Sequence, residues 1–141
     1  MPYDARQRRQ IADHCWQVYE SILRSFTPSP EFHVQFPERT ELALWSGALQ
    51  ARIALSQGYA VEIHEEYDFR DRELVIAQYS YVLLGQDQVP LMRADPLPHH
   101  RVDYRRRKLM NFPHHLHDEH ARIRSFSGQL EDFLTQAATL V

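Results

Sequence analysis

The chain has 141 residues, of which 43% are hydrophobic and 25% charged, as is typical of one globular domain. This composition excludes a disordered tail, and the length excludes a multidomain assembly. A single cysteine, Cys15, cannot form an internal disulfide, which fits a reducing compartment. No apolar run approaches the roughly 20 residues of a membrane-spanning helix, and no secretory signal is evident. We therefore expect a cytoplasmic protein that has no membrane contact.

Histidine and charge are concentrated in one part of the chain. Six of the nine histidines lie within residues 99–120. Residues 31–91 carry ten acidic side chains against four arginines, whereas residues 92–124 carry eight arginine or lysine side chains against four acidic ones. Arg105, Arg106, Arg107 and Lys108 form an uninterrupted cationic run, a pattern that favours binding to a polyanion.

Hydrophobic periodicity predicts a helix followed by strands. Apolar residues recur at three- and four-residue steps over residues 6–26, which indicates an amphipathic helix, and Trp16 and Trp45 are expected in the core. Period-two alternation then predicts strands at 32–36, 41–46, 49–56, 59–68, 73–84 and 88–93. Gln57-Gly58 and Gly85-Gln86-Asp87 are typical of tight turns, so neighbouring strands are expected to be antiparallel.

The pattern changes after Arg93, because prolines interrupt it. We expect a helix over about 127–140, with Ser125 or Ser127 as its N-cap. The predicted fold class is α+β: an antiparallel sheet of five or six strands with helices from both ends of the chain and a long histidine-rich loop. The predicted single domain, 1–141, divides into an N-terminal helical extension (1–30), the sheet (31–93), the loop (94–121) and a C-terminal helix region (122–141).

Two His-His pairs in the predicted loop each follow a proline, His99-His100 after Pro98 and His114-His115 after Pro113. Prolines restrict the backbone, so these imidazoles are expected to be held in place rather than carried on a flexible tail. Long ordered loops in compact domains are often functional. This segment is the main candidate for chemistry.

The first hypothesis is a metal-independent endoribonuclease. One uncharged imidazole would remove the 2′-OH proton of RNA, and one imidazolium would protonate the 5′ leaving oxygen. No cofactor is expected in this hypothesis. Its catalytic candidates are His100, His114, His117, Arg93 and Asp95. Its candidates for nucleic-acid binding are His99, His115, Tyr79, Tyr81, Tyr104, Arg105, Arg106, Arg107 and Lys108.

Two alternatives stay open. A noncatalytic module would use the basic run to bind nucleic acid or a partner protein, in a salt-sensitive manner. A metal-dependent hydrolase would use His115 and His117 with His100 and Asp95 as ligands. The spacing of these residues matches neither a paired-cysteine site nor His-Glu-x-x-His.

These motifs also resemble a known family. Three segments together are similar to TumE-type toxins of bacterial type II toxin–antitoxin modules. They are Tyr79-Ser80-Tyr81, Arg93-Ala94-Asp95-Pro96-Leu97-Pro98-His99-His100 and Asn111-Phe112-Pro113-His114-His115-Leu116-His117. The resemblance spans about Arg52 to His117. The chain departs from the family pattern at four places: Ala94, Pro96-Leu97, Leu116 and the longer connection over 103–110. The resemblance implies the toxin of such a module, with a cognate helix-turn-helix antitoxin as partner, and supplies no mechanism. Combined with the histidine chemistry, the first hypothesis is a toxin that acts on RNA. A second copy of the chain is a further candidate partner.

Overall fold

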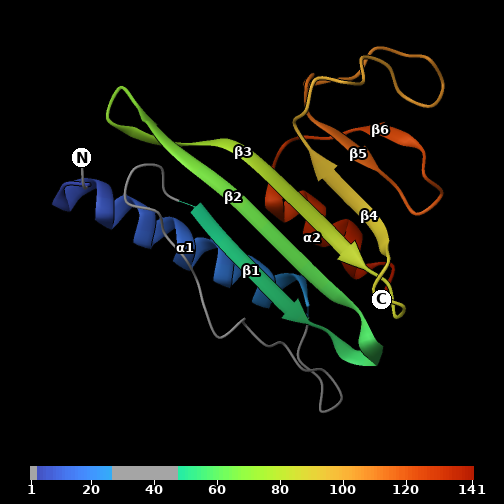
Figure 1. The fold of residues 1–141 in the computed structure, drawn as a ribbon, viewed down its shortest axis with the longest axis horizontal. Coiled ribbons are helices and arrows are strands. Elements are labelled where there is room, and N and C mark those ends of the chain that lie inside the picture. The colour runs from blue at the N-terminus through green and yellow to red at the C-terminus, as the bar shows by residue number, and fades with distance from the viewer. Residues whose placement is uncertain (1–2, 27–47) are drawn as a thin grey trace.

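The computed structural model describes residues 3–26 and 48–141 and shows an α+β fold (Figure 1). Helix α1 (Ala5–Ser25) comes from the N-terminal part and helix α2 (Leu130–Ala138) from the C-terminal part. The strands are β1 (Ala48–Ala54), β2 (Ala60–Arg70), β3 (Glu73–Leu84), β4 (Pro90–Asp95), β5 (His115–His117) and β6 (Ile123–Ser125). All neighbouring strands are antiparallel, and the six-stranded sheet has the strand order of the chain. The predicted fold class is confirmed.

The strands agree with the prediction in the middle of the chain and differ at its ends. Strands β1 to β4 correspond to the four predicted from residue 49 onward, and the two predicted turns connect β1 to β2 and β3 to β4. The strands predicted at 32–36 and 41–46, like Trp45, lie outside the described residues. Segment 94–121 was expected to be a loop but contains β5, and segment 122–141 contains β6 before its helix. Strands of three residues are too short to produce a periodic signal.

Helix α1 begins at a capping box. The Asp4 side chain accepts a hydrogen bond from the Gln7 backbone N–H at 2.8 Å, and the Gln7 side chain accepts one from the Asp4 N–H at 3.0 Å. Ile11 and Ile22 are buried on the face that meets the sheet. Trp16 is 62% exposed, so its predicted core position is wrong. It lies five positions after Ile11, about 140° around the helix from the buried face.

Helix α2 begins later than predicted. Its N-cap is Gln129, which makes no capping hydrogen bond through its side chain, so the prediction of Ser125 or Ser127 as N-cap is wrong. Both serines bind backbone elsewhere: Ser127 Oγ accepts from the Gln129 N–H and Ser125 Oγ from the Met110 N–H. Within the part of the chain that the structure describes, no helix is both long and apolar enough to cross a membrane.

Both helices cover the same face of the sheet (Figure 1), and the hydrophobic core lies between them and the strands. Alternation along β2 sends Val61, Ile63 and Tyr67 into this core, where each is at most 2% exposed. Glu62 and His64 point to the opposite face, as their alternation predicted. We call this opposite face the open face. The open face is where the polar residues of β1 to β5 gather.

One polar group lies inside the core. Glu65 is fully buried, and its carboxylate accepts hydrogen bonds from the hydroxyls of Tyr67 and Tyr81, while His14 Nε2 of α1 lies 2.8 Å from its Oε1. Burial acts to raise the pKa of Glu65, but the hydrogen bonds from His14, Tyr81 and Tyr67 outweigh it and hold the pKa below its ordinary value. Glu65 is therefore a charged anchor between helix α1 and the sheet.

Candidate functional site

The pairing of β4 with β5 places polar side chains of two distant segments side by side. Arg93 is paired with His117 and Asp95 with His115, and all four lie on the open face. Leu116, between the two histidines, points the other way and is 1% exposed in the core. The alternation of a strand thus explains the sequence His-Leu-His: one apolar residue anchors β5, and two imidazoles face outward from the core.

The loop after β4 brings two more imidazoles over this surface. The Asp95 carboxylate accepts a hydrogen bond from the backbone N–H two residues later at 2.9 Å, which turns the chain back. The His99 ring then lies 4.8 Å from that of His115, and the His100 ring lies 5.1 Å from His115 and 5.3 Å from His117, between ring centroids. One ring nitrogen from each of the four histidines lies within 4.8 Å of the others. We call His99, His100, His115 and His117 the imidazole cluster.

The cluster is built around a fully buried ring. His115 has 0% exposure, and its Nδ1 donates to the carbonyl oxygen of Pro113 at 3.1 Å. Its Nε2 and that of His117 are buried and have no hydrogen-bond partner in residues 3–26 or 48–141. The Asp95 Oδ1 lies 3.5 Å from His115 Nε2, within ion-pair distance but without hydrogen-bond geometry. Two ring nitrogens in the cluster are therefore buried and unsatisfied.

The surroundings disfavour positive charge on two of the rings. Burial lowers the pKa of His117 to about 4, with further contributions from Arg93 and the neighbouring rings of His115 and His100. Burial also lowers the pKa of His100, and the rings of His99 and His115 add to the effect. Both imidazoles are uncharged at neutral pH, so their nitrogens can accept a proton or bind a metal ion.

The cluster borders an accessible groove. Arg93 and His117 line a depression of about 310 Å³ together with residues of β4 and of the turn after β5, including Asp118 and Glu119. Arg93 and His117 are neighbours across β4 and β5, so the groove has a cation beside an imidazole where a phosphate can approach. This groove gives solvent and small groups access to His117.

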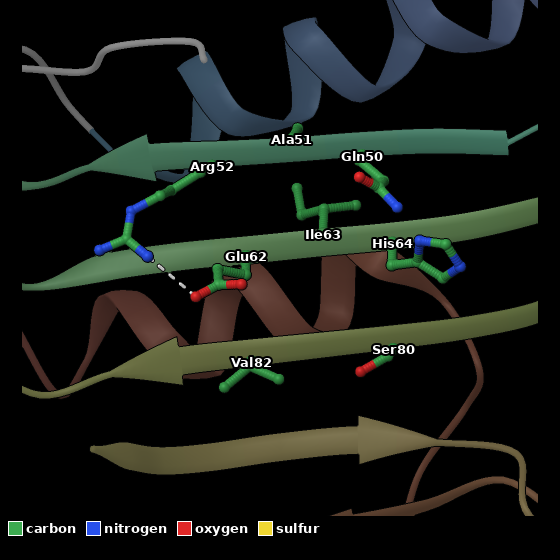
Figure 2. Close-up of a pocket in the computed structure, with 8 residues that line it drawn as sticks. All are labelled: Gln50, Ala51, Arg52, Glu62, Ile63, His64, Ser80 and Val82. Atoms are coloured by element: carbon green, nitrogen blue, oxygen red, sulfur yellow. Dashed lines mark hydrogen bonds and ion pairs between the residues drawn. The ribbon is translucent and has the colours of Figure 1, made fainter. Parts of the chain in front are cut away.

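A larger hollow of about 360 Å³ lies elsewhere on the open face, over β1 to β3 (Figure 2). Its side chains include Gln50, His64 and Ser80, and Arg52 pairs with Glu62 at 2.9 Å. The hollow offers a single imidazole and no group of potential metal ligands. The cluster at β4 and β5, rather than the larger hollow, therefore holds the chemistry-bearing groups.

His114 lies outside the imidazole cluster. Its Nδ1 is 2.9 Å from the Tyr79 hydroxyl oxygen, and the two rings stack at 5.7 Å. Gly128 also packs against this ring: it has a φ of +84°, and a Cβ there would lie 2.8 Å from the His114 ring. Of the three histidines predicted as acid–base residues, the structure brings together His100 and His117 and places His114 in a separate packing contact.

Two of the predicted nucleic-acid contacts are core residues. Tyr79 and Tyr81 stack at 4.6 Å, and they are 5% and 0% exposed. Tyr81 binds the buried Glu65. Both side chains point from β3 toward the helices, so they cannot contact a nucleic acid in this fold, and the prediction for these two residues is wrong.

The cationic run forms a small hairpin of its own. Residues 101–108 follow the cluster directly, and Val102 pairs with Lys108 in an isolated bridge. We call residues 101–108 the basic hairpin. The guanidinium carbons of Arg105, Arg122 and Arg124 lie 5.2, 5.2 and 5.0 Å from the centre of the Tyr104 ring. Arg122 and Arg124 were not predicted as contacts, because they lie outside the uninterrupted cationic run, although both belong to the basic segment 92–124.

Acidic residues neutralise some of these cations and leave others available. Asp103 pairs with Arg107 at 3.1 Å, and Asp118 pairs with Arg124. Arg105, Arg106 and Lys108 are exposed and form no ion pair within the described ranges. These three cations are available to an anionic ligand.

Comparison of the chain with family models, with curated proteins and with solved structures found no match.

Proposed function

We propose that this chain is an endoribonuclease that acts at the imidazole cluster, and that it is the toxin of a toxin–antitoxin pair. One observation carries the proposal. Four imidazoles from two segments meet beside Arg93, at the point where the chain enters the basic hairpin. A site for cleaving a phosphodiester needs proton-transfer groups, a cation for the developing charge and a surface that holds the polyanion. All three requirements are met within one region.

The reaction follows from the chemistry of RNA. An uncharged imidazole of the cluster, His100 or His117, removes the 2′-OH proton, and the 2′ oxygen attacks the adjacent phosphorus. The bond from phosphorus to the 5′ oxygen breaks, and that oxygen takes a proton from another ring of the cluster in its imidazolium form. The products are a 2′,3′-cyclic phosphate and a 5′-hydroxyl, and proton exchange with solvent returns both rings to their starting forms. Arg93 stabilises the negative charge on the phosphoryl oxygens during the attack. The need for a 2′-OH restricts this reaction to RNA.

The basic hairpin is suited to a single strand of RNA. Arg105, Arg106 and Lys108 provide cations for the phosphates, and the Tyr104 ring among its guanidinium groups provides an aromatic surface beside them. Proteins that bind single strands combine these two elements. The hairpin follows His100 directly, so a strand held on the hairpin is led toward the cluster.

The toxin assignment rests on the resemblance of the Pro-His-His motifs to TumE-type toxins. It implies a cytoplasmic protein that is kept inactive by a cognate helix-turn-helix antitoxin. The exposed cations of the basic hairpin are a suitable target for an acidic surface of such a partner. Blocking the hairpin would prevent RNA from reaching the cluster.

Incubating the purified chain with a single-stranded RNA oligonucleotide tests the proposal. We expect fragments that end in a cyclic phosphate, and a DNA oligonucleotide of the same sequence to stay intact. Replacing Arg105, Arg106 and Lys108 together by alanine should lower RNA affinity at least about tenfold at low salt. The slope of log K against log salt should fall by about 2, since each phosphate contact on a single strand contributes about 0.7.

The matched control replaces Arg9, Arg70 and Arg72, three exposed cations on α1 and at the β2–β3 turn, and should leave affinity and slope nearly unchanged. Salt-sensitive binding without cleavage would overturn the ribonuclease proposal and identify the noncatalytic binding module. Absence of both binding and cleavage would overturn both functions.

A further inference from the structure

We infer that the imidazole cluster binds one divalent transition-metal ion of the zinc class, through His99, His100, His115 and His117. The site goes beyond the proposed ribonuclease activity, because it follows from the cluster's own geometry and would exist without that activity. It also differs from the ligand set considered from the sequence, since His99 takes the place of Asp95. Three features of the structure carry the inference.

The first feature is the donor set and its spacing. Four imidazole nitrogens favour zinc, nickel, copper or cobalt, whereas calcium and magnesium take oxygen ligands. The four ring nitrogens lie within 4.8 Å of one another. Nitrogens bound to a tetrahedral zinc ion at 2.0–2.1 Å lie about 3.3 Å apart, so the rings need to close by roughly an ångström. His99 is exposed and His100 half-buried on a loop, where such a shift is easily accommodated.

The second feature is the pair of unsatisfied nitrogens. His115 Nε2 and His117 Nε2 are buried and have no hydrogen-bond partner in the described part of the chain. Buried polar atoms in native proteins nearly always have a partner, so two such atoms in one cluster require an explanation. A metal ion bound by both nitrogens satisfies them at once.

The third feature is the way in which the buried ring is held. His115 Nδ1 donates to the Pro113 carbonyl oxygen at 3.1 Å, which fixes the proton on Nδ1 and leaves the lone pair on Nε2. Metal-binding histidines usually make this kind of hydrogen bond through the nitrogen that does not bind the metal. His115 Nε2 also lies 3.5 Å from Asp95 Oδ1. A carboxylate therefore lies beside the site and offsets the charge of the ion.

A bound ion would change the role of the cluster in the proposed reaction. A nitrogen that binds the ion cannot also accept a proton, so the metal-bound cluster would not use His100 or His117 as the base. The proposed proton transfer belongs to the metal-free cluster, and in the metal-bound cluster the ion would supply an electrophile instead. Arg93, across from His117, would then share the stabilisation of phosphoryl charge with the ion.

Zinc binding to the full chain tests the inference directly. The protein is first treated with a chelator, and zinc is then measured by equilibrium dialysis, with cobalt(II) absorption as a second readout. We expect one zinc ion per chain and visible cobalt bands of a nitrogen-rich site. His99→Ala and His100→Ala, which change loop residues, should each weaken zinc affinity at least tenfold.

His64→Ala and His120→Ala are the matched controls, because both rings lie outside the cluster, and they should bind zinc as the unchanged chain does. No zinc binding, or an equal loss of affinity in the controls, would overturn the metal site. The two proposals fail separately: zinc binding without RNA cleavage overturns the ribonuclease, and RNA cleavage by a chain that binds no zinc overturns the metal site.

Discussion

Replacing His117 by alanine is expected to lower the rate of RNA cleavage at least 100-fold. His117 belongs to the imidazole cluster, faces Arg93 and lines the accessible groove. Loss of a positioned proton-transfer group typically lowers a rate by about 10² to 10⁴. The measurement is the initial rate of oligonucleotide cleavage, with thermal unfolding recorded for each variant. His117→Gln keeps a polar side chain of similar reach in β5 and should show the same loss.

The other histidines provide the comparison that makes this result specific. His114→Ala should lower the rate less than tenfold, because His114 packs on Tyr79 outside the cluster. His120→Ala should leave the rate unchanged, because the ring is exposed in the turn after β5. Equal losses for His114 and His117, without a change in unfolding temperature, would contradict the assignment of the chemistry to the cluster.

Replacing Glu65 by glutamine is expected to lower the free energy of unfolding by about 3 kcal/mol, since hydrogen bonds to a buried charge contribute about 1.5–3 kcal/mol each. Glu65 accepts from Tyr67 and Tyr81 and pairs with His14 of α1. A glutamine amide has one oxygen, so its NH₂ group would face a donor. Chemical denaturation at pH 7 measures the loss.

The same substitution should change the dependence of stability on pH. The pKa of Glu65 in the folded chain is lower than the ordinary value of 4.5, so its charged form is favoured by folding. The stabilisation is therefore complete above about pH 4.5 and is lost as the pH falls through the folded-state pKa. Unfolding free energy should fall more steeply below about pH 4.5 in the unchanged chain than in Glu65→Gln.

Glu62→Gln is the matched control, because Glu62 lies on the same strand but on the open face. Its ion pair with Arg52 is exposed, so the substitution should lower the free energy of unfolding by less than about 1 kcal/mol. A Glu65→Gln variant as stable as Glu62→Gln would show that Glu65 does not anchor helix α1 to the sheet.

The fold was predictable where the sequence contains a long periodic signal. Helix α1 and strands β1 to β4 each span at least six residues, and their alternation and turn residues placed them correctly. Strand β5 has three residues, and two of them are histidines, so nothing in its local sequence distinguishes it from a loop. It forms a strand because Leu116 anchors it in the core and β4 offers a free edge, which are properties of the tertiary structure.

The candidate site was predictable as a segment but not as a set of residues. The two Pro-His-His motifs marked the correct part of the chain. An imidazole of β5 joins the cluster only if it projects from the open face of the sheet. The pairing register of β5 with β4 decides which residues project from that face, and this register cannot be read from the sequence. His114 precedes the strand and packs on Tyr79, whereas His99, assigned only to nucleic-acid binding, joins the cluster.

Both proposals require that the rings of His99, His100, His115 and His117 meet in one place. This convergence can be measured by nuclear Overhauser effects between ring protons of the chelator-treated chain, with the histidine rings assigned individually. The structure predicts cross-peaks from His115 to both His99 and His100, whose ring centres lie 4.8 and 5.1 Å away. If the rings of His99 and His100 showed no cross-peak to His115 or His117, the cluster, and with it the site proposed here, would be contradicted.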